Sequence, residues 1–217
     1  MAKKVIIIDY KLGNLFSVNQ VLLNIGLDVT ISSDPADILG ADAIVLPGVG
    51  AFKDAMQNLN DMHLADAIRT FIRTGKPFLG ICLGLQLLFT SSEEFGASEG
   101  LNLIEGEVKR FANTDVVGNS VKVPQIAWNT IQKTSNQPWE NTALQDIEDL
   151  TDMYFVHSYY VVPKDQSVVL TTSSYAGLSY ASSIKKDNIF ACQFHPEKSA
   201  SEGIKIYKNW ATINKLF

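Results

Sequence analysis

Three short segments in the first 82 residues, 4–9, 41–46 and 77–82, constrain the fold more than any other feature of this sequence. Each is mostly apolar and rich in β-branched or large side chains. Runs of this kind are typical of parallel strands that are buried on both faces of a sheet. Between them, residues 15–25 and 64–72 place apolar side chains at helical spacing, and each stretch is followed by a glycine that can end a helix. This alternation predicts a doubly wound α/β fold with parallel strands.

The second half of the chain changes character. The stretch after Cys82 is expected to continue as a helix over 83–89, followed by a solvated acidic loop over 91–100, and a last helix is expected to begin at Ser201. The strands expected in this half are 107–111, 121–123, 126–131, 153–162, 168–172, 180–184 and 189–194. We therefore expect a single α/β domain over residues 1–217, whose mixed sheet is parallel in its first half, antiparallel toward one edge, and flanked by helices.

Composition and charge exclude several classes of protein. The 217 residues carry 18 Lys and Arg against 23 Asp and Glu, and no concentrated basic face that a nucleic-acid-binding protein would need is visible. The N-terminal apolar run stops at Asp9, well short of the roughly 7–15 residues of a signal peptide or the about 20 of a spanning helix. Cys82 and Cys192 are far apart and outside any metal-binding spacing, so we expect no disulfide, no metal site, no membrane association and a cytoplasmic location.

The pentapeptide Gly80-Ile81-Cys82-Leu83-Gly84 lies where the predicted strand 77–82 passes into a helix. Small residues two positions before and after a nucleophile let the chain turn abruptly and hold the side chain in a strained, exposed position. The helix dipole there favours a thiolate, although a base must complete the deprotonation. Cys82 is therefore a candidate nucleophile, and a buried structural cysteine between closely packed glycines is the alternative.

Three histidines are available as the base. His63 begins an amphipathic helix and is expected to be a surface or capping residue, and His157 ends a strand and can be a wall residue. His195 is followed by Pro196 and Glu197, so a carboxylate can hold one imidazole nitrogen while the other faces a nucleophile. A His-Pro-Glu sequence alone is typical of a surface turn, so the choice of His195 as base and Glu197 as orienting acid depends on their pairing with Cys82.

Backbone N–H groups are expected to stabilise a developing oxyanion. The N–H of Leu83 follows the nucleophile directly, and the loop Gly48-Val49-Gly50 is the expected source of a second donor, at Val49 or Gly50. A glycine-rich loop after a strand can instead hold a phosphate. Residues 47–50, however, match neither common nucleotide-binding pattern, which disfavours that reading.

Together these motifs resemble those of the class I (triad) glutamine amidotransferases. Residues 80–86 are similar to the family's nucleophile motif, and residues 193–197 to its base and orienting acid. The order Cys, His, Glu also agrees, whereas α/β-hydrolases place the acid before the histidine. The resemblance runs along the whole chain, through residues 9–14, 47–52, 124–129, 154–159 and 193–199.

The resemblance implies a glutaminase. Cys82 attacks the side-chain amide of glutamine, His195 transfers protons and Glu197 orients His195. A γ-glutamyl thioester forms, ammonia leaves, and water releases glutamate. No metal and no organic cofactor is implied.

The resemblance also implies a binding site and a partner. Its pattern is closest to a member that delivers ammonia to a (β/α)₈-barrel cyclase subunit in histidine biosynthesis, which would make the protein one half of a heterodimer. The residues implied in glutamine binding are Gly48, Gln86, Ser158 and Tyr159. Those implied in the partner interface are Asn14, Trp128, Tyr154 and Lys198.

Some positions depart from the family pattern. The usual His-x-Gly-Trp-Asn is Gln125-Ile126-Ala127-Trp128-Asn129 here, and Lys11 stands where a glycine usually follows Asp-Tyr. The usual Gly-Leu-Gly-Leu is Gly-Leu-Asn-Leu at residues 100–103, so Asn102 takes the place of a glycine. None is a triad residue, so these departures do not affect the implied glutaminase chemistry. They leave open which protein accepts the ammonia. A paralogue that feeds a surface-sugar amidotransferase is one alternative.

Two alternatives of other classes follow from the same residues. A non-catalytic scaffold subunit is disfavoured by the intact Cys82, His195, Glu197 and Gln86. A stand-alone cysteine hydrolase is disfavoured by the lack of an additional substrate domain and by Trp128, an aromatic residue that looks exposed and suits an obligate partner.

Overall fold

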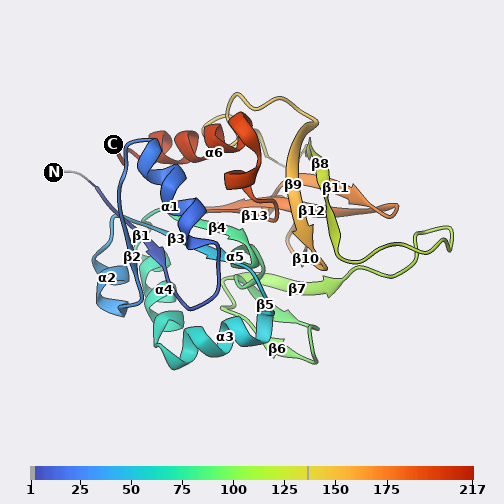
Figure 1. Cartoon of the computed structure of the whole chain (residues 1–217), viewed down its shortest axis with the longest axis horizontal. Helices are drawn as coiled ribbons and strands as arrows, with labels where there is room; N and C mark the ends of the chain where they lie inside the picture. Colours follow the sequence, from blue (N-terminus) through green and yellow to red (C-terminus); the bar gives the residue numbers. More distant parts are fainter. Residues whose placement is uncertain (1–2, 136) are drawn as a thin grey trace.

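The computed structural model describes residues 3–135 and 137–217 and shows one mixed sheet with helices on both of its faces (Figure 1). The helices are α1 (Leu15–Asn24), α2 (Pro35–Gly40), α3 (Phe52–Asp61), α4 (Leu64–Arg73), α5 (Leu83–Gln86) and α6 (Ala200–Ile213), with 3₁₀ turns η1 (Gln166–Val168) and η2 (Pro196–Lys198). The strands are β1 (Lys4–Ile8), β2 (Asp28–Ser32), β3 (Ala43–Gly48), β4 (Phe78–Cys82), β5 (Phe89–Ser92), β6 (Ser98–Glu99), β7 (Ile104–Arg110), β8 (Gln125–Lys133), β9 (Thr151–His157), β10 (Tyr159–Pro163), β11 (Val169–Tyr175), β12 (Leu178–Lys186) and β13 (Ile189–Cys192).

The sheet has a parallel half and a mostly antiparallel half, which confirms the predicted fold class. Strands β2, β1, β3, β4 and β13 lie side by side and run parallel. From β13 the order continues through β12, β10, β7, β5 and β6, and the pairs β13–β12, β12–β10 and β10–β7 are antiparallel. The last strand of the chain thus joins the parallel half and places residues after Cys192 beside those after β4.

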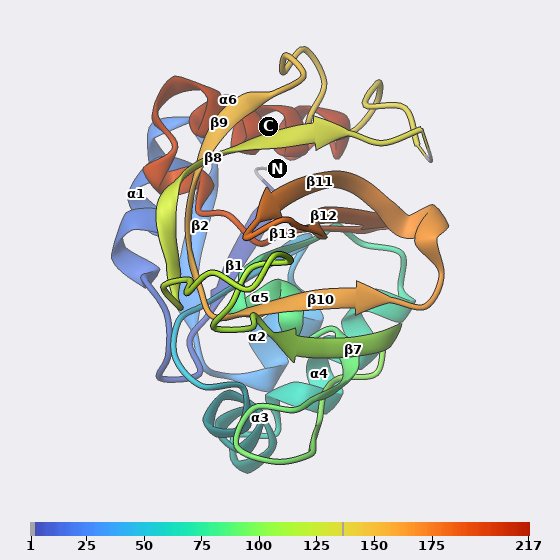
Figure 2. The same ribbon diagram turned by 90° about the vertical axis from the view of Figure 1, so that its right-hand side faces the viewer.

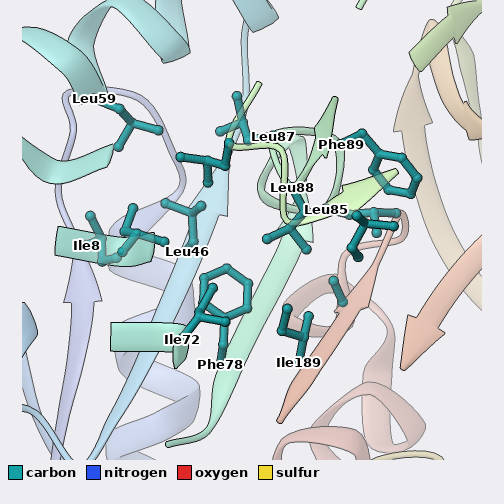
Figure 3. Close-up of a cluster of buried hydrophobic side chains, with 14 of the residues drawn as sticks. Ile8, Leu46, Leu59, Ile72, Phe78, Leu85, Leu87, Leu88, Phe89 and Ile189 are labelled. Carbon is teal, nitrogen blue, oxygen red and sulfur yellow. The ribbon is translucent and has the colours of Figure 1, made fainter. Parts of the chain in front are cut away.

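The apolar strands of the parallel half supply two cores, one on each face of the sheet. In β1, Ile6 and Ile8 pack with buried side chains of α2, α3 and α4, whereas Val5 and Ile7 pack with those of α1 and α6. Successive side chains of a strand point to opposite faces, so a continuous apolar run serves both cores. Figure 3 shows part of the first core, where Phe78 of β4 is among the side chains drawn.

Strands β8 and β9 form an antiparallel hairpin on the side of the molecule that carries β10, β11 and β12. Figure 2 turns this side toward the viewer and shows the two strands running together. The hairpin pairs residues 125–131 with residues 151–157, and β8 continues into a short pairing with β11.

Two expectations after Cys82 are wrong. The helix predicted over 83–89 ends at Gln86, because Phe89–Ser92 forms strand β5 and pairs in parallel with β7. The stretch 91–100 is not only a solvated loop, since it contains the end of β5, strand β6 and a buried glutamate, Glu94. Helix α3 was not predicted at all.

Two expected strands also differ. Residues 121–123 are not a strand, because the N–H of Val121 donates to the Asn113 carbonyl oxygen and closes a loop instead. The segment 153–162 is two strands, since His157 pairs with β8 while Tyr159 pairs with β7, and the chain changes partner at Ser158. Within the described residues, none of the helices has the length and apolar character needed to cross a membrane.

Candidate active site

The carboxyl ends of three adjacent parallel strands bring the predicted site residues together. β4 lies between β3 and β13, with Gly48 in register with Cys82 on one side and Cys192 in register with Ile81 on the other. His195 follows three residues after β13 ends. In open α/β sheets this edge of the sheet is where ligands bind.

The backbone at Cys82 has the strained turn that the sequence predicts. Its φ is +54° and its ψ is −108°, and a positive φ is uncommon for residues other than glycine. The turn also requires close packing, because a Cβ on Gly84 would clash with the Leu46 carbonyl oxygen and one on Gly80 would lie 2.9 Å from the Ala191 Cβ. Strain of this kind is estimated at about 1–3 kcal/mol and is typical of functional sites.

His195 and Glu197 form a buried pair. His195 Nδ1 lies 2.8 Å from Glu197 Oε1, and the two side chains are only 2% and 1% exposed. The second carboxylate oxygen of Glu197 accepts a hydrogen bond from the Tyr207 hydroxyl at 3.5 Å. The backbone N–H of His195 donates to the Tyr154 carbonyl oxygen at 2.9 Å, so β9 fixes the segment that carries the ring.

The His195 ring is electrostatically coupled to the Cys82 sulfur. Burial lowers the pKa of His195, but the negative charges of Cys82 and Glu197 outweigh burial and raise it to about 10. His195 Nε2 is buried and has no hydrogen-bond partner among residues 3–135 and 137–217. Because Glu197 holds Nδ1, Nε2 is the ring nitrogen available for proton transfer with the sulfur.

The other two histidines lack these features. His157 is buried, its Nδ1 lies 2.8 Å from the Tyr159 carbonyl oxygen, and its Nε2 lies 3.4 Å from the Tyr180 hydroxyl. Burial lowers the pKa of His157 to about 4, so its ring is neutral at pH 7. His63 is exposed at the start of α4. Both agree with the wall and surface positions expected from the sequence.

A cavity of about 280 Å³ opens beside Cys82. It is lined by Val49, Gly50, Cys82, Leu83, Gln86, Glu94, Pro124, Val156, His157, Ser158 and Tyr159. The lining includes the three residues expected to supply oxyanion donors and three of the four expected to bind glutamine. The fourth, Gly48, is buried at the end of β3, where a Cβ would clash with the Tyr10 hydroxyl and the Leu83 side chain.

Glu94 is a lining residue that sequence reasoning missed. Its carboxylate accepts a hydrogen bond from the Phe52 N–H at 2.6 Å, and burial raises its pKa although that bond opposes the shift. Phe52 begins α3, two residues after the loop 48–50 ends. The only sequence signal was the acidic stretch, which gave no reason to single out Glu94 because its partner lies 42 positions away.

Tyr10 is a second residue that the sequence did not single out as part of the site. Its side chain is fully buried, its hydroxyl has no hydrogen-bond partner among the described residues, and it lies against Gly48. Burial, and to a smaller degree the charge of Cys82, raise the pKa of Tyr10. The hydroxyl therefore stays protonated.

Three of the four residues expected at a partner interface lie together. The Trp128 and Tyr154 ring centroids are 6.1 Å apart, and Lys198 Nζ lies 5.6 Å from the Tyr154 ring centroid. Trp128 is 53% exposed. Asn14 precedes α1, a helix that packs against η2, which carries Lys198.

The departures from the family pattern leave the triad unaltered. Lys11 and Asn102 replace glycines and keep positive φ values of 71° and 52°. Gln125 is fully buried and accepts a hydrogen bond from the Tyr180 hydroxyl at 3.1 Å, and Ala127 is exposed on β8.

A second depression lies away from this site. A larger depression of about 700 Å³, lined by Arg69 and Arg73 among others, shares no residue with the triad. In the part of the chain that the structure describes, three or more His, Cys, Asp or Glu side chains do not gather anywhere in a way that could hold a metal ion.

Curated relatives match almost the whole chain. The protein named imidazole glycerol phosphate synthase subunit HisH of Geobacter metallireducens is 47% identical over 206 residues, which cover 94% of this chain and 96% of that protein. The HisH protein of Moorella thermoacetica is 46% identical and the HisH 1 protein of Legionella pneumophila is 42% identical, each over at least 95% of both chains.

Solved structures share the fold at low sequence identity. The structure of PurLQS from Thermotoga maritima matches with a TM-score of 0.70 and 17% identity over 98% of this chain and 99% of that chain. A glutamine amidotransferase from the same organism matches with a TM-score of 0.62 and 17% identity, over 99% of this chain and 83% of that one. The family model for glutamine amidotransferase class-I matches residues 6–213, so the chain belongs to the class-I glutamine amidotransferase family.

Proposed function

We propose that this chain is the glutaminase subunit of an imidazole glycerol phosphate synthase, and that it hydrolyses glutamine through a Cys82–His195–Glu197 triad. The observation that carries the chemistry is the strained Cys82 at the end of β4, coupled to a His195 that Glu197 holds at 2.8 Å. The relatives named HisH, at 42–47% identity, support the assignment to this synthase.

The first half of the reaction forms a thioester. Transfer of the sulfur proton to His195 Nε2 gives the thiolate, which attacks the side-chain carbonyl carbon of glutamine. The N–H groups of Leu83 and of Val49 or Gly50 stabilise the oxyanion of the tetrahedral intermediate. The imidazolium then gives its proton to the departing nitrogen, the C–N bond breaks, and ammonia leaves a γ-glutamyl thioester on Cys82.

The second half regenerates the cysteine. His195, now neutral, takes a proton from water while the oxygen attacks the thioester carbonyl carbon. Collapse of the second tetrahedral intermediate breaks the C–S bond, glutamate is released, and the proton on His195 returns the site to its starting state. Glu197 keeps Nδ1 protonated and oriented in both halves.

Glutamine is recognised by the walls of the cavity beside Cys82. Among its lining residues Glu94 is the one carboxylate, and we assign it to the α-ammonium group of glutamine. Gln86, Ser158 and Tyr159 line the same cavity and hold the rest of the substrate, while Gly48 keeps the loop close to Leu83.

The ammonia acceptor is a partner subunit. We propose a (β/α)₈-barrel cyclase that docks on the face formed by Asn14, Trp128, Tyr154 and Lys198, where the exposed Trp128 is suited to be a buried anchor in the complex. Docking favours the orientation of the loop 48–50 that turns its N–H donors toward the oxyanion, a coupling of about 1–3 kcal/mol or more.

The proposal also covers the domain organisation and the cellular location of the protein. Residues 1–217 act as one glutamine amidotransferase domain. The protein works in the cytoplasm, where a reducing environment keeps the free thiols Cys82 and Cys192 reduced.

The proposal is tested by reconstituting the chain with a barrel cyclase. Glutamate release at saturating glutamine is measured for the free chain and for the complex with acceptor or an analogue bound. A much faster rate in the complex, with imidazole glycerol phosphate formed from glutamine, is the expected result. Equal rates with and without the cyclase would instead favour a stand-alone hydrolase, and activation only by a sugar amidotransferase would identify the paralogue.

A further inference from the structure

Gln193 is fully buried and contacts the nucleophilic sulfur, yet the steps above give it no role. Its Nε2 lies 3.6 Å from Cys82 Sγ, and its Oε1 lies 3.0 Å from Gln86 Nε2. Its backbone N–H donates to the Ser182 carbonyl oxygen at 2.8 Å. Both the backbone and the side chain of Gln193 are therefore held in place.

The contact with Gln86 determines which end of the Gln193 amide faces the sulfur. Gln86 points one terminal atom at the Tyr159 carbonyl oxygen, 2.9 Å away, and at the Gln193 side chain. A backbone carbonyl only accepts, so this Gln86 atom is the NH₂ group, and it needs an oxygen on Gln193 as its other partner. Gln193 consequently turns its own NH₂ group toward Cys82.

We propose that Gln193 is a further catalytic residue, which stabilises the thiolate of Cys82 by donating an N–H of its side-chain amide to Sγ. A neutral amide does not take the sulfur proton, but it bonds more strongly to a charged acceptor than to a neutral one. It therefore favours the state in which the proton has moved from Sγ to His195. The sulfur loses its negative charge as it bonds to the carbonyl carbon of glutamine. Gln193 therefore raises the fraction of Cys82 that is present as thiolate and does not stabilise the oxyanion.

The test is the rate at which iodoacetamide alkylates Cys82 as a function of pH, measured in a Cys192→Ala background so that one thiol reports. In Gln193→Met, a side chain of similar length without a donor, the acid limb of the profile should move to higher pH. On that limb the rate should fall about tenfold, since a hydrogen bond to a charged group contributes about as much as one pKa unit. Gln193→Glu keeps the shape and the acceptor for Gln86, and should shift the limb further because a carboxylate faces the sulfur.

Gln125→Met is the matched control. Gln125 is also fully buried, but its oxygen accepts from Tyr180 and it makes no hydrogen bond with Cys82 within the described residues. This variant should keep the parental alkylation profile. If Gln193→Met does not fold, the alkylation profile of Gln193→Glu alone tests the inference.

An unchanged acid limb in a folded Gln193 variant would overturn the inference. The inference rests on the proposed function, and the two failures are distinguishable. Glutamine hydrolysis that survives in Cys82→Ala contradicts the proposed function. Hydrolysis that requires Cys82, together with a Cys82 alkylation profile that Gln193 substitutions leave unchanged, contradicts only the role of Gln193.

Discussion

Replacement of Glu197 by glutamine isolates the electrostatic part of the His195–Glu197 contact. The new amide would keep an oxygen for His195 Nδ1, and its NH₂ group can donate to the Tyr207 hydroxyl, so both hydrogen bonds of the buried pair have replacements. What is lost is the negative charge beside the imidazolium. A hydrogen bond to a charged group contributes about 1.5–3 kcal/mol against about 0.5–1.5 for a neutral one, so the imidazolium loses about 1–2 kcal/mol.

This loss has a defined sign and size. The pKa of His195, raised to about 10 in the native chain, should fall by about one unit, and glutamate release should fall about tenfold. A raised histidine pKa stabilises the folded state fully below the unfolded value of about 6.5, and this contribution is lost as pH rises through about 10. In Glu197→Gln the loss should therefore occur at lower pH.

The assay is an NMR titration of the His195 ring nitrogens, with the melting temperature followed over the same pH range. His157→Asn is the comparison variant and should leave the His195 titration nearly unchanged, because the effect of one ring on the other is the smallest contribution to the pKa of His157. Identical His195 titrations in the parent and in Glu197→Gln would refute the reasoning.

Three further predictions follow from single side chains. Glu94→Gln keeps the acceptor for the Phe52 N–H but loses the negative charge in the cavity, so KM for glutamine should rise about tenfold or more with a smaller change in kcat. An unchanged KM would contradict the assignment of Glu94 to the α-ammonium group. Tyr10→Phe removes a buried hydroxyl that has no partner in the described part of the chain, so denaturant unfolding should show unchanged or greater stability, by about 1 kcal/mol, and a clear loss would mean that the hydroxyl is bonded. Trp128→Ala should weaken binding of the cyclase by about 2 kcal/mol or more in calorimetry. The melting temperature of the free chain should stay nearly unchanged, since Trp128 is 53% exposed. Equal affinities of the two proteins for the cyclase would exclude Trp128 as an anchor.

The parallel half of the fold could be predicted because its signal is local. Strands such as 4–8 serve two cores, and the resulting apolar run is visible in the sequence without knowledge of any neighbour. The same holds for Cys82, whose flanking glycines are needed for packing against Leu46 and Ala191, and for the two-residue spacing of His195 and Glu197.

The features that were missed depend on distant partners. The strand break at Ser158 exists because β9 and β10 pair with different neighbours, and β5 forms where a helix was expected because β7 lies beside it. Glu94 enters the site only because its carboxylate reaches the start of α3. Local patterns carry no information about such contacts.

The most direct test of the account is glutamate release by Cys82→Ala at saturating glutamine in the complex with the cyclase, compared with Cys192→Ala. The account predicts that Cys82→Ala releases no glutamate and forms no product from glutamine, yet still supports product formation from added ammonium salts, because the partner needs only the nitrogen. Cys192→Ala, whose thiol is fully buried, should keep glutamine hydrolysis. Glutamine hydrolysis that persists in Cys82→Ala would contradict the account.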